Sequence, residues 1–382
     1  MEAMRLLVLL GLLGASIARH YQEHHGTDEP ERAFYVARLG PDYVPFLEYY
    51  AALAERSGTG HPDRDSYSAL VRWNVPHTEV HYRGELLASI EGVFPDGRIR
   101  TYTGTRGEES FFEVIKMGEC LEQAANRMLA PIADGRLPFA EPKAIERVAT
   151  ATAMLYALRH LMLEFPHLPA SVGMHPAHFM DVFRQFAVHW RPGDLPPSGA
   201  MDTEAITRDF LLGISYPGYA DGIRRLFPGL LSEERHVLAR QMDQPSLPTV
   251  LLRGLNLTTG DIDSMSRSDK RGLVVEHPEL VAWFNLLQAH GRASSAHLGL
   301  SKKMLFNPQR RREAADLAGD PVVDNHIGTT GMTETFLTEL TRHRQQHQLR
   351  ALRDAVVHAG LAVSDEIGLE VQVTVEGRVG LL

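Results

Sequence analysis

The chain has 382 residues, enough for one large and one small domain, and a hydrophobic content of 44% supports a substantial core. Acidic residues outnumber basic residues by 48 to 39, and no basic stripe with interleaved aromatic residues occurs. Nucleic acid is therefore not an expected partner. Cys120 is the only cysteine, which excludes a disulfide within the chain, a CxxC metal or redox site and an iron–sulfur cluster.

The N-terminal segment has two interpretations. The uncharged run 6–18 is similar to a signal peptide, but Glu2 cancels the positive charge of Arg5 that such a peptide needs. The run is also too short to span a bilayer. We therefore favour a buried first helix, and we expect a cytoplasmic protein without a membrane partner.

Further along the chain, the pattern changes from mixed to helical near residue 108. Residues 43–53 predict a short amphipathic helix, and residues 79–90 and 98–102 predict a pair of strands. Helical spacing of apolar residues then recurs, and the tail 369–379 alternates like a strand. The predicted helices span 111–129, 142–164, 176–190, 201–214, 233–242, 278–288, 293–306 and 333–359. The fold class is therefore mostly α, with a small mixed domain at 1–107 and a large helical domain at 108–382.

Arg184 lies in the middle of an aromatic stretch that contains Phe179 and ends at Trp190. Its aliphatic stem could pack in the core while the guanidinium reaches water. Alternatively, the guanidinium points into a cavity, where it can hold a carboxylate through two hydrogen bonds.

Two loops of small residues open into predicted helices. Residues 196–201 read Pro-Pro-Ser-Gly-Ala-Met, in which Ser198 can donate a hydrogen bond to a ligand, or Ser198 or Asp202 can cap the helix. Residues 327–334 form a Gly/Thr loop that lacks the Lys-Ser/Thr of a P-loop, so we expect either a helix cap at Thr333 or a mobile lid.

His297 follows a long apolar helix signal and is preceded by small residues at 293–296. Small side chains on a helix allow a flat, bulky partner to approach the backbone. No Cys or carboxylate lies at zinc-ligand spacing, and a single His in an apolar environment is typical of haem ligation. The alternative is a structural, hydrogen-bonded histidine, in a chain that has 19.

Taken in order, these segments resemble the haem-dependent aromatic oxygenase superfamily, which includes the indoleamine and tryptophan 2,3-dioxygenases. Within it, the chain is most similar to the ring-rearranging enzymes of pyrrolnitrin biosynthesis. The similarity covers most of the chain, and it includes an Arg six residues before a Trp, here Arg184 and Trp190.

The resemblance implies a role for each of these segments. His297 would be the proximal ligand of haem b, Arg184 would bind the substrate carboxylate, and Thr329 would contact the substrate from the flexible loop. The pocket residues would be Phe111, Phe179 and Ser198. Asp209 matches a carboxylate that pairs with an Arg ahead of the proximal histidine, which makes Arg292 its expected partner here.

The resemblance also implies the reaction class. We expect a haem enzyme that oxidises the ring of an aromatic amino acid, L-tryptophan or a derivative of it, with O2 or H2O2, in secondary metabolism. Ile115 stands where the dioxygenase has a Ser, and the distal loop lacks the glycine-rich form, which argues against plain dioxygenation to N-formylkynurenine. The alternatives are a peroxygenase for L-tyrosine or a methylated tyrosine, a non-catalytic haem sensor, and a helical scaffold without haem.

Overall fold

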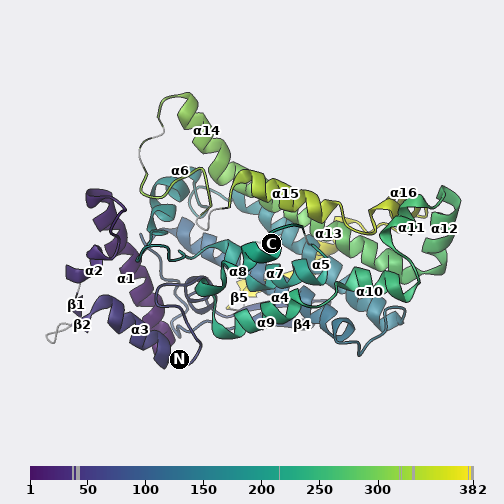
Figure 1. Ribbon diagram of the computed structural model, residues 1–382, viewed down its shortest axis with the longest axis horizontal. Coiled ribbons are helices and arrows are strands. Elements are labelled where there is room, and N and C mark those ends of the chain that lie inside the picture. The colour runs from purple at the N-terminus through teal and green to yellow at the C-terminus, as the bar shows by residue number, and fades with distance from the viewer. Residues whose placement is uncertain are drawn as a thin grey trace.

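A computed structural model describes residues 1–36, 38–39, 44–214, 216–317, 319, 321–328, 332–376 and 378–379. Helix accounts for 64% and strand for 5%, so the prediction of a mostly α fold is confirmed. Helices α1 to α3 form one end of the long axis and α10, α11, α12 and α16 the other (Figure 1).

The helices and strands have the following bounds. The helices are α1 (Glu2–His25), α2 (Arg32–Val36), α3 (Phe46–Arg56), α4 (Arg106–Ala133), α5 (Pro142–Glu164), α6 (Pro176–His178), α7 (Thr203–Leu211), α8 (Tyr219–Arg224), α9 (Ser232–Met242), α10 (Leu247–Gly254), α11 (Thr259–Ser264), α12 (Arg267–Glu276), α13 (Pro278–Ser301), α14 (Asn307–Ala314), α15 (Glu334–Gln345) and α16 (Arg353–His358). The strands are β1 (Arg38–Leu39), β2 (Val44–Pro45), β3 (Thr78–Tyr82), β4 (Glu85–Ile90), β5 (Val371–Val375) and β6 (Arg378–Val379).

The larger sheet has the order β4-β3-β5-β6, and all of its pairs are antiparallel. Residues 79–90 form a hairpin by themselves, because Arg83 and Gly84 both adopt positive φ in the turn between β3 and β4. The predicted partner strand at 98–102 is wrong, and the C-terminal strand β5 pairs with β3 instead. The prediction of a strand in the tail is confirmed.

The core is layered around α5. Helix α4 packs against the sheet on one side and α5 on the other, α5 packs along α13, and α13 packs along α15. Residues 151–158 of α5 are all buried, as expected for a helix that is surrounded by other elements. The sequence predicted a break between 288 and 293, but α13 continues through Gly291. A Cβ atom there would lie 3.1 Å from the backbone oxygen of Arg344, so the glycine lets α15 approach.

Two other predicted helices are shorter or less regular than expected. The 176–190 segment consists of α6, a π-helical turn at Phe179–Phe183 and a 3₁₀ turn that ends at Phe186. Trp190 therefore lies outside the helix, and its buried ring packs against Phe34 and Tyr50. The 333–359 segment is broken after Gln345, and a separate helix α16 follows.

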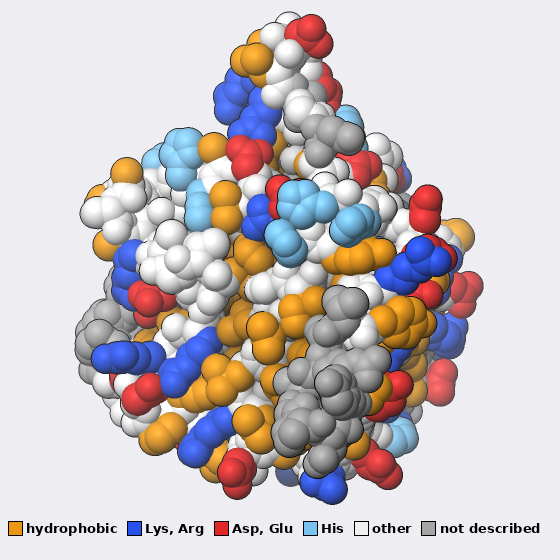
Figure 2. Space-filling view, turned by 90° about the vertical axis from the view of Figure 1, so that its left-hand side faces the viewer, with side chains coloured by type: hydrophobic (Ala, Val, Ile, Leu, Met, Phe, Trp, Pro, Cys, Tyr) orange, Lys and Arg blue, Asp and Glu red, His pale blue; other side chains and the backbone are white. Residues whose placement is uncertain are grey.

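Helix α1 covers the end of the molecule that faces the viewer in Figure 2, where hydrophobic side chains gather near the middle of the surface. One side of α1 is in the core, with Leu7 and Val8 fully buried, while Leu9 and Leu13 are exposed. The helix is long and apolar enough to cross a membrane, a test that buried core helices and signal sequences also pass.

Candidate functional site

A cavity of about 420 Å³ lies among α4, α5, α7, α13 and α15. Its size and largely apolar walls are those of a small-molecule or cofactor site. Six of the residues singled out in the sequence line this cavity, namely Phe111, Phe179, Arg184, Ser198, Asp209 and His297. Arg292 is not among the lining residues, and Thr329 lies outside the described residues, although its neighbour Gly328 lines the cavity.

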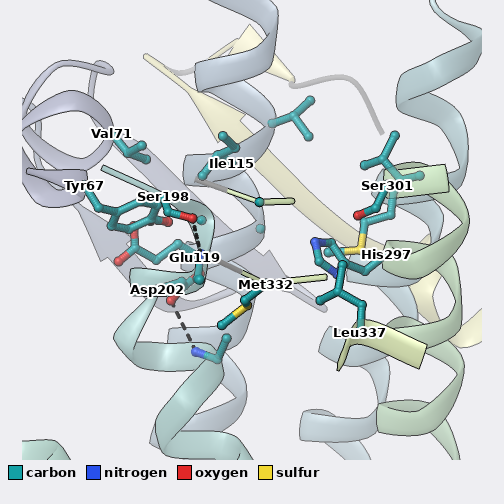
Figure 3. Close-up of a pocket in the computed structure, with 18 of the residues that line it drawn as sticks. Tyr67, Val71, Ile115, Glu119, Ser198, Asp202, His297, Ser301, Met332 and Leu337 are labelled. Carbon is teal, nitrogen blue, oxygen red and sulfur yellow. Dashed lines mark hydrogen bonds between the residues drawn. The ribbon is translucent and has the colours of Figure 1, made fainter. Parts of the chain in front are cut away.

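His297 projects from α13 into the cavity, and Ser198 and Asp202 lie on the facing wall (Figure 3). The imidazole lies inside the protein, but part of its surface is accessible because it borders the cavity and not other side chains. Burial lowers its pKa to about 4, and the positive charge of Arg344 acts in the same direction. Within the described chain, neither ring nitrogen has a hydrogen-bond partner. A neutral imidazole with a free nitrogen can bind a metal.

Phenylalanine rings form the wall around Phe111. The centroid of the Phe111 ring lies 5.4 Å from that of Phe179 and 5.0 Å from that of Phe183. These separations are typical of packed aromatic pairs. This part of the cavity can therefore hold a flat apolar ligand.

Arg184 is 4% exposed and has no carboxylate in contact within the described residues. Its Nη2 donates to the backbone oxygens of Asp324 (2.9 Å) and Ile327, while its Nη1 has no partner in that part of the chain. Burial lowers its pKa to about 10, against the opposing charge of Asp324. A buried cation with an unused donor is suited to an anionic ligand group.

Asp209 does not pair with Arg292, so that prediction is wrong. Arg344 of α15 holds Asp209 through two bonds, Nε–Oδ1 at 2.8 Å and Nη2–Oδ2 at 2.6 Å. His290 and Tyr219 complete the set at 2.9 and 2.6 Å. Although burial raises the pKa of Asp209, these partners hold it far below its usual range. Arg292 is exposed, because α13 turns its side chain away from α7 and toward Tyr156.

The small-residue loop behaves as the helix start that the sequence allowed. Ser198 Oγ accepts a hydrogen bond from the amide of Ala200, and Asp202 Oδ1 accepts from those of Glu204 (2.9 Å) and Ala205 (3.2 Å). Both side chains also line the cavity, so capping and ligand contact are compatible. Thr333 likewise caps α15, its Oγ1 accepting from the amide of Phe336.

Most of the polar residues that line the cavity were not predicted from the sequence, and Asp202 was predicted only as a helix cap. These residues are Tyr67, Glu119, Glu122, Asp202, Arg208, His290 and Arg344. Arg72 bonds to Glu119, and Arg208 donates to Glu122 at 2.9 Å. Burial raises the pKa of Glu119 to about 7, despite the charge of Arg72. The sequence did contain a signal, because charged residues recur every three positions from 113 to 122 between apolar residues of the same helix.

No family model matches this chain, and no curated protein shows significant sequence similarity to it. Within the described residues, no group of three or more His, Cys, Asp or Glu side chains is placed to hold a metal ion. An axial histidine with a porphyrin does not require such a group.

Proposed function

We propose that this chain is a b-type haem oxygenase that acts on the ring of an aromatic amino acid, L-tryptophan or a tryptophan derivative. The observation that supports this most directly is His297, a neutral imidazole with no hydrogen-bond partner in the described residues, facing a large and mostly apolar cavity. The large domain, residues 108–382, would be of the indoleamine 2,3-dioxygenase type and the protein cytoplasmic.

Three features of the cavity support a bound haem. His297 can supply the axial nitrogen, the apolar walls suit the porphyrin faces, and small residues precede His297 on the same helix. When bound, the haem would supply the activation of O2 or H2O2 for attack on the substrate ring.

The protein residues would orient the substrate and exclude water. Arg184 would bind the substrate carboxylate through its unused Nη1 donor. Phe111 and Phe179 would hold the aromatic ring by packing against it, and Ser198 would donate a hydrogen bond toward the ligand. Fixing the ring in one orientation raises the rate by lowering the entropic cost of reaction.

The experiment that tests the proposal is a visible spectrum of the purified protein, titrated with aromatic amino acids. We expect a Soret band that shifts on addition of L-tryptophan. Product masses obtained with O2 and a reductant, or with H2O2, then identify the oxidant. A protein without a Soret band would be a helical scaffold, and a band with neither shift nor turnover would indicate a sensor. A shift with L-tyrosine and turnover with H2O2 would indicate the peroxygenase.

The role of Arg184 is tested by comparing two ligands. Arg184→Ala should weaken L-tryptophan binding by about 2–5 kcal/mol, the range for losing one partner of a buried charge pair. Tryptamine lacks the carboxylate, so its affinity should be the same in both proteins. An unchanged affinity for L-tryptophan would contradict the role.

A further inference from the structure

Glu122 of α4 has a carboxyl oxygen without a partner. The residue is 5% exposed and lines the cavity. Its Oε1 accepts from Arg208 Nη2 at 2.9 Å, but its Oε2 is buried, and no N–H or hydroxyl group of the described residues donates to it. A buried acceptor that lacks a donor is costly, so a proton or a ligand group belongs at this position.

Asp202 supplies the other half of the arrangement. Its carboxyl group lies within hydrogen-bonding reach of that of Glu122, while its Oδ1 caps α7. An ionised carboxyl group only accepts hydrogen bonds, so a bond between two carboxyl groups requires a proton on one of them. Burial and the charge of Glu122 raise the pKa of Asp202 well above its usual value, which places the proton on Asp202.

The surroundings favour keeping this proton, because negative groups outnumber positive ones. The neighbouring charged and titratable side chains are Tyr67 and Arg72, Glu119 on α4, Glu204 and Arg208 on α7, and Glu234 on α9. Arg72 forms ion pairs with Glu119 and Glu234, and Arg208 forms an ion pair with Glu122. Neither arginine is hydrogen-bonded to Asp202 in the described residues, although Nη1 of Arg208 has no partner there.

The pair is also placed to meet a ligand. Asp202 and Glu119 lie on one wall of the cavity with Tyr67 and Ser198, and His297 lies on the facing wall (Figure 3). A proton on Asp202 would therefore lie at the wall of the cavity that would contain a bound molecule.

We propose that Asp202 and Glu122 share one proton on the cavity wall and donate it to the ligand during the reaction. The O–H bond of Asp202 breaks as a bond forms between the proton and the ligand, and the pair regains a proton from solvent water. The role in a reaction rests on the function proposed above, whereas the shared proton does not depend on haem.

The test uses infrared spectroscopy and turnover on the full chain. We expect the carbonyl stretch of a protonated, buried carboxyl group at about pH 8.5, where Glu119, with a pKa of about 7, is largely ionised. Asp202→Asn should remove this band, and Glu122→Gln should shift it, because the proton on Asp202 then bonds to an amide oxygen instead of a carboxylate. Asparagine is as good an N-cap as aspartate, so Asp202→Asn should fold. Glu204→Gln is the matched control: this neighbour bonds to Asn126 and lies outside the cavity lining, and its variant should keep the band.

Turnover of L-tryptophan completes the test. Loss of a general acid should lower the rate by about 10²-fold or more in Asp202→Asn, with haem content and the Soret shift unchanged. If the band is absent from the wild type, survives in Asp202→Asn, or is not shifted in Glu122→Gln, the shared proton is refuted. If the band is lost but turnover is unchanged, the donor role is refuted. A protein without haem would overturn the proposed function, and the band alone would then decide on the shared proton.

Discussion

At the scale of single residues, histidines in this protein differ in what their ring nitrogens contact. His61 is hydrogen-bonded at both nitrogens, to Ser66 and to a backbone oxygen. His290 is also bonded at both, to Asp209 and to a guanidinium that can only donate, so its own proton lies on Nε2. His297 has no such bond within the described chain, although it is enclosed by protein. His61 and His290 therefore have structural roles as hydrogen-bonded residues, whereas His297 has a ring nitrogen available to bind a metal.

Replacing His297 by Ala should abolish haem retention, because no second axial ligand is predicted. The measurement is haem per polypeptide, from the pyridine haemochrome and the Soret absorbance. His347→Ala is a matched control, since His347 is also buried and has an unpartnered Nδ1, but lies outside the cavity lining. Full haem occupancy in His297→Ala would refute the assignment.

His61 should make the stability of the protein depend on pH. Burial lowers its pKa to about 4, whereas an unfolded histidine titrates near 6.5. Between these values the unfolded chain binds a proton that the folded chain does not. The stability is therefore fully present above pH 6.5, and about 1.4 kcal/mol is lost per pH unit as the pH falls toward 4.

The measurement for His61 is the free energy of unfolding against pH, for the wild type and His61→Gln. Between pH 6.5 and 4.5 the slope of this free energy against pH should be smaller in the variant by about 1.4 kcal/mol per pH unit, which corresponds to the uptake of one proton. Equal slopes would show that His61 does not stay neutral in the folded protein. The difference between the two proteins isolates this residue from the carboxyl groups that titrate in the same range.

At the scale of elements, the spacing of apolar residues predicted most of the central helices, but it did not predict which helices contact one another. Helix α5 was predicted, and α13 was predicted as two separate helices, because apolar residues recur in them at helical spacing. The partner of Asp209 was mispredicted, because Arg344 reaches it from a helix that is distant in the sequence. The resemblance to the haem-dependent aromatic oxygenases implied Arg292, and nothing in the sequence shows which face of α13 meets α7. Non-local pairs of this kind are decided by tertiary packing.

Arg344→Met tests this pairing. The substitution would leave the buried Asp209 charge without its cation, which should lower the free energy of unfolding by about 3–5 kcal/mol. Arg292→Met changes an exposed side chain on α13 and should alter stability by about 0.5 kcal/mol or less. Chemical denaturation of both variants measures the difference. If Arg292→Met were the more damaging of the two, the observed pairing would be wrong.

At the scale of the whole molecule, strands from both predicted domains form one sheet. The sequence predicted a small domain at 1–107, and the division itself stays a prediction. Strand β5, close to the C-terminus, pairs with β3 within that segment, and α4 and α5 pack against β5. Alternation predicted a strand in the tail, but its partner could not be predicted, since strand pairing over some 290 positions leaves no local signal. The sheet should therefore unfold together with the helical core.

Truncation of the chain after Glu370 should prevent stable folding. It removes Val371, Val373 and Val375, which are all buried, and burying such a side chain contributes about 1.5–3 kcal/mol. Their sum is comparable to the whole stability of a typical domain, about 5–15 kcal/mol. Truncation after Glu376 is the matched control, because it keeps β5 and the bond from the Glu376 amide to the His77 oxygen at 2.8 Å. Thermal unfolding followed by circular dichroism should show a native-like transition for the control only. A cooperative transition at the wild-type temperature in the shorter protein would mean that pairing of β5 with β3 is not needed for stable folding.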